Sequence, residues 1–355
     1  MRISAWPAFL IGQDNPYTKL LYSSMTARGV QVEDFSAWKA LLRRYDVFHL
    51  HWPEHYVVHP NSFKAVAGTL VLLSCLSWLR LRGTKVVWTV HNLAAHDRRR
   101  PRLERLFWRL FADRVDGFLV LTEAGLDQAR AHFPKLRSLP GFVVPHGVYH
   151  DAYPNDVTRS EARRQLQVGQ DQPVILFLGH IAEYKNVPAL ARAFRMLDDP
   201  EARLVIAGRI ASEQDAKAVR DAAGLDQRIQ IRSGYVAPEE IQLYFNAADL
   251  VVLPFREILN SGSALLALSF EKPVLVPALG AMPELQAAFG PDWVRTYEGE
   301  LTPEELRVAL EWARRPQRPR PSQLASFSWD EIAKRTLEAY VEIPARSDLA
   351  RVARR

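Results

Sequence analysis

The sequence is nearly devoid of cysteine, which narrows the class of protein. Cys75 is the only cysteine in 355 residues, so no disulfide can form within the chain. A cytoplasmic location is the simplest expectation. Met1–Trp6 is typical of a strand, and the apolar core of a signal peptide is missing there. The charge-free run of residues 65–79 is too short to span a bilayer comfortably.

What is present is ordinary for a globular protein, apart from its charge. The chain is 48% hydrophobic and 24% charged, and it is long enough for two domains. Its net charge is +6, with arginines concentrated in residues 98–114 and at the C-terminus. Such clusters attract nucleic acid, anionic lipid or phosphorylated small molecules. Because no nucleic-acid-binding motif is present, we expect no nucleic-acid partner.

Strand-like and helix-like segments alternate along the chain, which predicts an α/β fold with parallel sheets. The alternation stops at the proline- and glycine-rich residues 140–154 and then restarts. We therefore predict two similar α/β domains, residues 1–150 and 151–321. Residues 322–355 would form a C-terminal helix and a basic tail that packs back on the N-terminal domain. The predicted strands are Arg2–Trp6, Val30–Glu33, Val47–Leu50, Lys85–Thr89, Gly117–Leu121, Phe142–Val144, Val174–Phe177, Arg203–Ala207, Ile229–Ser233, Leu250–Leu253 and Pro273–Val276.

Open parallel sheets bind ligands beyond the carboxyl ends of their strands. With two such sheets, we expect the site in a cleft where the two rims face each other. Two loops of the second domain then stand out. Residues 260–263 run through Ser and Gly into an apolar helix, whose first amides suit a phosphate. Residues 179–186 have the same strand–loop–helix form and supply Lys185. The two loops predict a bound diphosphate, although ordinary turn chemistry would also explain either loop alone.

Loops of the first domain carry polar and aromatic side chains at the same rim. A sugar-binding wall around Trp52 is the favoured interpretation of residues 49–55, and a zinc site through the His-x-His spacing is the alternative. For His49 alone we expect a satisfied core histidine. The predicted catalytic residues are Asp97, Glu54 and His91. Asp97 or Glu54 would act as the general base and His91 would grip a substrate hydroxyl, although Asp97 could equally be a helix cap or part of a surface salt bridge. The predicted acceptor-binding residues are Asn15, Tyr17, His51, Trp52 and Asn92.

Arg98–Arg114 interleaves arginines with leucines and aromatic residues. A basic amphipathic helix of this kind often lies on an anionic membrane surface, which is the predicted partner. The alternative is a helix that covers the sheet and exposes a solvated basic side.

Several short motifs recur in a fixed order along the chain: Val144–Val148, Phe177–His180, Lys185-Asn186, Val205–Gly208, Gly234–Val236, Ala248–Pro254 and Lys272–Leu275. Together they resemble the motifs of GT-B glycosyltransferases, especially glycosyltransferase family 4, and the resemblance covers nearly the whole chain. It implies two Rossmann-like domains, a nucleotide-sugar donor held by the second one, and no metal or other cofactor. It also implies that Lys185 and the helix start at Ser261–Ser263 contact the donor diphosphate.

The chain departs from this family at two places. His180 stands where the family usually has arginine, and the family's paired glutamates fall near Ile258 and Leu266. Glu257 could replace the first glutamate, but nothing replaces the second. The predicted donor-binding residues are Gly179, His180, Lys185, Gly208, Arg209, Tyr235, Val236, Arg256, Glu257, Asn260, Ser261, Gly262 and Ser263.

Residues 49–55, 15–17 and 260–263 together are similar to those of bacterial exopolysaccharide mannosyltransferases of the xanthan type. This similarity implies an inverting transfer of mannose from GDP-mannose to a lipid-linked saccharide. The enzyme would then lie peripherally on the inner face of the cytoplasmic membrane. The alternatives are a retaining family-4 transferase that uses a UDP- or GDP-sugar, and a non-catalytic relative that only binds nucleotide sugars.

Overall fold

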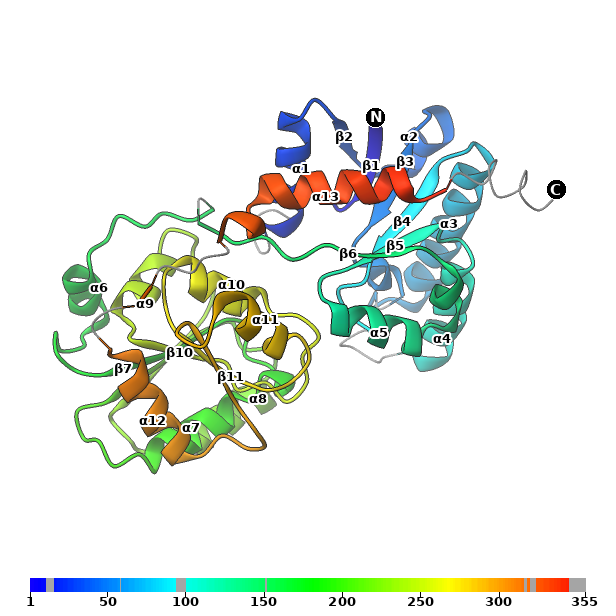
Figure 1. The fold of residues 1–355 in the computed structure, drawn as a ribbon. Coiled ribbons are helices and arrows are strands. Elements are labelled where there is room, and N and C mark those ends of the chain that lie inside the picture. Colours follow the sequence, from blue (N-terminus) through cyan, green and yellow to red (C-terminus); the bar gives the residue numbers. More distant parts are fainter. Residues whose placement is uncertain are drawn as a thin grey trace. The chain divides into compact units, whose positions relative to one another are not determined.

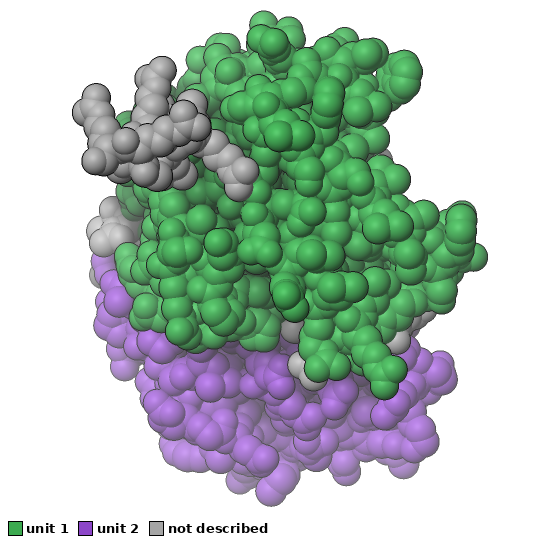
Figure 2. Space-filling view, turned by 90° about the vertical axis from the view of Figure 1, so that its right-hand side faces the viewer, with its two compact units in different colours: residues 1–147, 326–355 green, residues 148–325 purple. Residues whose placement is uncertain are grey.

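The structure is a computed structural model that describes residues 1–10, 16–57, 59–93, 100–150, 152–315, 318–319 and 324–344. The chain forms two compact units (Figure 1, Figure 2). Unit 1 comprises Met1–Gly147 with Ser326–Arg355, and unit 2 comprises Val148–Ala325.

Unit 1 is built on a sheet of six strands in the order β2-β1-β3-β4-β5-β6, and each pair is parallel. Every residue of β3 and β5 is buried, as expected for parallel strands covered on both faces. The strands are β1 (Arg2–Trp6), β2 (Gln31–Asp34), β3 (Val47–Leu50), β4 (Lys85–Thr89), β5 (Gly117–Val120) and β6 (Gly141–Val143).

Alternate residues of these strands enter two separate cores. Val47 and Val87 pack with residues of α1 and α13, whereas Phe48 and Trp88 pack with residues of α3, α4 and α5. The C-terminal helix α13 lies against α1 (Figure 1), so both ends of the chain contribute to this unit. The helices are α1 (Tyr17–Ala27), α2 (Ala37–Leu42), α3 (Ser62–Leu81), α4 (Pro101–Ala112), α5 (Glu123–His132) and α13 (Trp329–Glu342), with 3₁₀ turns η1 (Pro53–Tyr56) and η2 (Pro134–Ser138). The 3₁₀ turn η4 (Leu324–Phe327) spans the boundary between the two units.

Unit 2 has a second six-stranded sheet, in the order β12-β11-β10-β7-β8-β9, again with parallel pairs. Side-chain caps begin several of its helices, such as the capping box of Thr302 and Glu305 on α12. The elements are β7 (Val174–Leu178), β8 (Arg203–Gly208), β9 (Ile229–Ser233), β10 (Leu250–Val252), β11 (Val274–Pro277), β12 (Val294–Tyr297), α6 (Arg159–Leu166), η3 (Glu183–Lys185), α7 (Val187–Arg195), α8 (Glu213–Ala223), α9 (Ile241–Ala247), α10 (Gly262–Ser269), α11 (Met282–Phe289) and α12 (Pro303–Ala313).

The predicted alternation is confirmed, and every predicted strand is present. Four elements were missed: the short edge strand β12 and the helices α2, α11 and α12. Helix α3 extends beyond the charge-free run of residues 65–79 at both ends. Among the described helices, α3 is long and apolar enough to cross a membrane by length and composition, with a mean hydropathy of 1.6 over its apolar window. However, 39% of that window is buried within the protein.

Candidate functional site

The strand order of unit 2 identifies the position where a ligand is expected. β8 lies on one side of β7 and β10 on the other, so the direction of the chain reverses between β7 and β10. Open α/β sheets bind ligands at this switch point, beyond the carboxyl ends of the strands. The loops that leave β7 and β10 carry Lys185 and residues 260–263.

Close contacts join these loops to one another. A Cβ atom on Gly179 would lie 3.5 Å from Ser263 Oγ, and the Arg256 amide donates to the Tyr184 carbonyl over 2.9 Å. Gly208 has a φ of +138°, and a Cβ atom there would lie 1.9 Å from the Gly179 carbonyl oxygen. Only glycine fits at position 208, so the ends of β7 and β8 approach closely.

Lys185 is the buried cation of this loop cluster. Its side chain is 8% exposed, with Nζ 4.5 Å from the ring centre of Phe255 and 5.3 Å from that of Tyr184. Burial lowers the pKa of Lys185 to about 8. Within the described residues no carboxylate forms an ion pair with it. A desolvated ammonium group without a counter-ion is suited to an anionic ligand.

Unsatisfied polar atoms accompany this lysine. Both amide atoms of Asn260 and Oδ1 of Asn186 are buried without a hydrogen-bond partner. Ser261 caps α10, because its Oγ accepts the amide proton of Ala264 over 3.1 Å. Buried polar atoms rarely lack a partner, so the start of α10 is a place where a polar ligand or water is expected.

The other predicted donor residues lie on neighbouring strand ends. His180, Arg209 and Tyr235 follow β7, β8 and β9 in turn, and all three are exposed. Although His180 is exposed, partial desolvation by its neighbours, followed by the charges of Lys185 and Arg209, lowers its pKa. Val236 is half-buried beside Tyr235, while Glu257 is exposed like Arg256.

The sequence argument missed several residues of this cluster. Phe255 and Tyr184 were overlooked because their role is to surround Lys185, which only the folded loops reveal. The loop after β11 also belongs here, since the Ala281 amide donates to the Leu259 carbonyl over 3.2 Å. Gly280, which lies shortly before α11, is the sequence signal that could have indicated this loop.

In unit 1 the switch point lies between β1 and β3. The loop after β3 carries His51, Trp52 and Glu54, and the loop after the neighbouring β4 carries His91 and Asn92. Two predicted residues, Asn15 and Asp97, lie outside the described residues.

Buried histidine and tyrosine side chains form a hydrogen-bonded network behind these loops. Tyr22 Oη lies 2.8 Å from His49 Nδ1 and 2.6 Å from His51 Nε2. Tyr340 Oη, from α13, lies 2.6 Å from the same His49 Nδ1. At the outer end, His51 Nδ1 lies 3.0 Å from His91 Nε2. We call these five side chains the histidine–tyrosine network.

The network holds its histidines in the neutral state. Burial lowers the pKa of His49 to about 3 and that of the nearby His146 to about 4. Burial, reinforced by neighbouring histidines, also moves the pKa values of His51 and His91 well below their usual range. His91 therefore offers a neutral imidazole, which the network orients from behind.

The same two loops also carry Trp52, Glu54 and Asn92. Trp52 stacks on the His91 ring with centroids 4.5 Å apart, and Asn92 Nδ2 lies 3.5 Å from Glu54 Oε1. Glu54 is 9% exposed, and burial raises its pKa to about 7. A carboxyl group with a pKa close to neutrality is well matched to general-base catalysis.

Three expectations in this region can be compared with the structure. His49 is a satisfied core histidine, as predicted. His51 and Tyr17 are 1% and 2% exposed and both lie against His91, so their predicted contact with an acceptor stays a prediction. Within the described chain, no group of three or more His, Cys, Asp or Glu residues could hold a metal ion.

The basic segment Arg98–Arg114 forms α4 from Pro101 onward, and its aromatic residues do not face solvent. Phe107, Trp108 and Phe111 are buried in the core beneath the sheet. Arg100 Nη1 donates to the His59 carbonyl and Arg114 Nε to Ser77 Oγ, so both of these arginines have structural roles. The geometry of this helix agrees with the alternative of a sheet-covering helix with a basic outer side.

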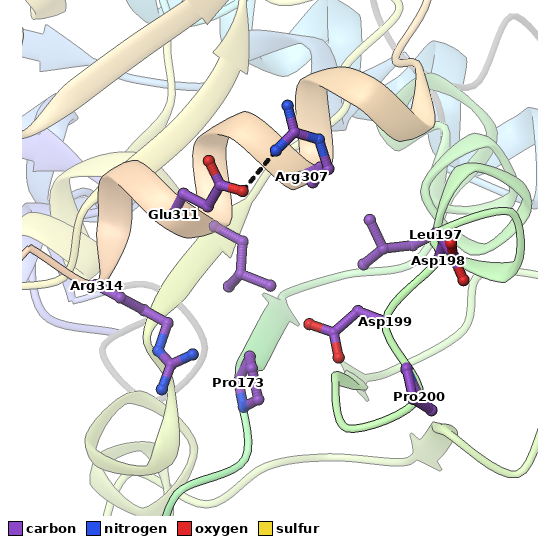
Figure 3. Close-up of a pocket in the computed structure, with 9 residues that line it drawn as sticks. Pro173, Leu197, Asp198, Asp199, Pro200, Arg307, Glu311 and Arg314 are labelled. Atoms are coloured by element: carbon purple, nitrogen blue, oxygen red, sulfur yellow. Dashed lines mark hydrogen bonds and ion pairs between the residues drawn. The ribbon is translucent and has the colours of Figure 1, made fainter.

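A cavity of about 550 Å³ lies elsewhere in unit 2 (Figure 3). It is bordered by Pro173, which precedes β7, and by Asp198–Pro200, which precede β8, so it opens at the amino ends of the strands. Its Arg307 is paired with Glu304 and Glu311. None of the predicted donor residues lines this cavity.

Solved structures share this architecture. A glycosyltransferase from Rickettsia africae superimposes with a TM-score of 0.67 at 13% identity, covering 96% of this chain and 98% of that one. Anabaena Alr3699/HepE, solved in complex with UDP and glucose, gives a TM-score of 0.66 at 15% identity over 96% and 99% of the two chains. The fold is therefore that of the GT-B glycosyltransferases.

The sequence comparisons identify the family of glycosyltransferases to which the chain belongs. Residues 158–294 match the family model described as glycosyl transferases group 1. The chain is 33% identical to a GDP-mannose:glycolipid 4-beta-D-mannosyltransferase of Xanthomonas campestris pv. campestris, over 92% of this chain and 88% of that protein. The chain belongs to the group 1 glycosyltransferases.

Proposed function

We propose that this protein transfers mannose from GDP-mannose to the saccharide of a glycolipid, with inversion at the anomeric carbon. The observation that carries the proposal is the 33% identity, over nearly the whole chain, to a transferase named for that donor and that acceptor class. The buried, unpaired polar groups of the loop cluster in unit 2 support it. The diphosphate of a nucleotide sugar would accept from Lys185 and Asn260 Nδ2, and its sugar hydroxyl groups would donate to the amide oxygens of Asn260 and Asn186.

In this proposal unit 2 binds the donor. Lys185, Arg256 and the first amides of α10 hold the diphosphate and stabilise the charge that develops on it as the sugar departs. The amide of Asn260 gains its missing partners from the ligand. Tyr235 and the backbone after β8 and β9 lie against the base.

The acceptor is activated by unit 1. Glu54 removes the proton from the attacking hydroxyl group, and neutral His91 binds a sugar hydroxyl beside the flat face of Trp52. Asp97 is the alternative base. The absence of the family's second glutamate favours the inverting course.

The glycolipid acceptor places the reaction at a membrane, and we propose a peripheral position on its cytoplasmic face, in exopolysaccharide assembly. Arg102, Arg105 and Arg109 on the outer side of α4 are exposed, and they supply the positive charge that the Arg98–Arg114 segment was predicted to present to anionic lipid.

The test is a transfer assay with radiolabelled GDP-mannose and a lipid-linked oligosaccharide, with the product anomer read by NMR. We expect a β-mannoside. An α-mannoside would replace the inverting course with a retaining one that uses Glu257. Binding of GDP-mannose that raises the melting temperature, without transfer to any acceptor tried, would instead identify a non-catalytic relative.

A further inference from the structure

The outer surface of α2 and α3 is unusually apolar. Half of the large apolar side chains that are exposed in the described chain belong to these two helices. On α2 they include Trp38 (69% exposed) and Leu42 (65%), and on α3 Phe63 (81%), Leu70 (60%), Val71 (49%) and Leu81 (81%). A surface helix normally turns polar side chains to solvent, so this face is the reverse of the usual pattern.

The apolar residues of α3 form a stripe along one side of the helix. Phe63, Leu70 and Leu81 recur with the spacing of helical turns, and the opposite stripe, which includes Leu72 and Leu76, is buried in the core against the sheet. Because the inner stripe is part of that core, α3 is held on unit 1 with only its outer stripe available to a partner.

The two helices present one continuous surface. They pack against each other, and Arg82 Nη1 donates to the Leu41 carbonyl over 2.6 Å, which joins their C-terminal ends. The Arg82 guanidinium also lies 5.7 Å from the ring centre of Trp78. We call this surface the α2–α3 face.

The charged residues of α2, α3 and the residues that directly follow them all have one sign. Residues 37–44 and 62–83 contain six lysines and arginines and no acidic residue. Some of these cations are neutralised, since Lys39 and Arg43 pair with Glu33 and Arg80 with Asp116. Arg44 and Lys64 have no acidic partner within the described residues, and the exposed arginines of the neighbouring α4 add to the positive rim.

We infer that the α2–α3 face is the membrane-docking surface, inserted shallowly into an anionic bilayer. Aromatic and aliphatic side chains would enter the boundary between headgroups and acyl chains, while the cationic rim contacts the negatively charged headgroups. A second copy of the chain would bring one cationic rim against another, which disfavours self-association. The inference rests on the proposed function, since a glycolipid acceptor is presented at such a surface.

The inference is tested by sedimentation with vesicles of phosphatidylcholine mixed with phosphatidylglycerol. The full-length protein should bind them, and should bind pure phosphatidylcholine vesicles much more weakly. The double variant Phe63→Gln/Leu70→Gln should partition about tenfold more weakly or worse. The matched control Met196→Gln/Leu225→Gln replaces two apolar residues of unit 2 that are 73% and 98% exposed, and it should bind like the wild type.

Two results would overturn the inference. One is a wild type that does not bind the anionic vesicles, or that binds no better than the Phe63/Leu70 variant. The other is a wild-type dimer, seen by light scattering, that becomes monomeric in the variant, because the face would then be a self-association surface. Transfer to a detergent-dispersed acceptor separates this inference from the proposed function. If the wild type binds vesicles but transfers no mannose, only the function fails; if it transfers mannose without binding vesicles, only the docking surface fails.

Discussion

The candidate sites of the two units differ in how their buried polar groups are satisfied. In unit 1 the rings of His49, His51 and His91 are linked through Tyr22 and Tyr340 into one network. In unit 2, Lys185 has no ion pair among the described residues, and the amide of Asn260 has no partner. A paired network orients its members before any ligand arrives, whereas unpaired groups gain their interactions only when a ligand binds. The candidate site of unit 1 is therefore preorganised, whereas we propose that the candidate site of unit 2 is completed by a bound ligand.

The largest effect is expected from Glu54→Gln, which removes the proposed base from unit 1. We expect kcat to fall by about a thousandfold. The wild-type rate should rise as the pH passes the raised pKa of Glu54, about 7, and this rise should disappear in the variant. The measurement is the steady-state rate as a function of pH, over about three pH units centred near pH 7.

The control for this variant is Asp127→Asn, which removes an exposed carboxylate of unit 1, on α5. It should leave the pH profile unchanged. A Glu54→Gln enzyme with normal rate and profile would move the base to Asp97.

Lys185→Met should lower the activity of the enzyme while raising the stability of unit 2. We expect kcat/KM to fall about a hundredfold, because the leaving diphosphate loses its buried cation. The same change should raise the stability of unit 2 by about 1–3 kcal/mol, since burial lowers the pKa of Lys185 to about 8 and the charged form is penalised. Steady-state kinetics measure the loss of activity, and chemical denaturation measures the gain in stability.

Lys272 offers a matched control, because burial also lowers its pKa to about 8, yet it precedes β11 at the amino ends of the strands. Lys272→Met should leave turnover unchanged. Equal losses of turnover in both variants would contradict a specific role for Lys185.

Acid should destabilise unit 1 before unit 2. The folded pKa values of His49, His51, His91 and His146 are all lowered, so these residues bind protons more readily when the chain is unfolded. Stability is therefore complete above their unfolded pKa of about 6.5 and falls as the pH decreases toward their folded values, by at most about 1.4 kcal/mol per pH unit for each histidine. The raised pKa of Glu54 has the opposite sign and offsets about one histidine between pH 4.5 and about 7.

Hydrogen exchange measured by mass spectrometry distinguishes the two units. Peptides from β3, β4 and α13 should lose protection as the pH falls from about 6.5 to about 4.5, while those from β7 and β8 keep theirs. Loss of protection in both units at the same pH would contradict the contrast between them.

The smallest effects should come from the tyrosines of the network. Tyr340→Phe removes one of two hydroxyl groups at His49 Nδ1 and should cost about 1 kcal/mol of stability. Tyr22→Phe should cost about 2 kcal/mol and lower kcat severalfold, because it leaves His51 Nε2 without its partner. Thermal unfolding and steady-state kinetics measure both, with Tyr244→Phe in unit 2 as the reference. Equal costs for the two variants would argue against a bridging role for Tyr22.

Much of the framework was predictable because it depends on local patterns. Apolar strands that alternate with amphipathic helices predicted two parallel sheets, and the rule for strand ends selected the loops that carry Lys185 and Asn260. Three of the four missed elements were short: α2, α11 and β12 have four to eight residues, over which a weak period is not distinctive. Helix α12 has 11 residues and a capping box, so its sequence carried a signal that was overlooked.

The interior of the site was not predictable, because it joins residues far apart in the chain. Tyr340 reaches His49 across 291 positions, and no pattern near either residue indicates this contact. The aromatic residues of α4 were expected to face a membrane, but they pack in the core, and the apolar face that remains exposed belongs to α2 and α3. Hydrophobic periodicity reveals that a helix has an apolar side; it does not tell whether that side meets a sheet or a lipid.

The sequence by itself determined the class of fold and the loops that bear the chemistry, because strand and helix periods and the residues that end them are written locally. Tertiary structure alone decided which of those residues are buried, paired or left unsatisfied. The state of a charge or an amide depends on everything within a few ångströms of it, and the chain brings those neighbours together only when it folds.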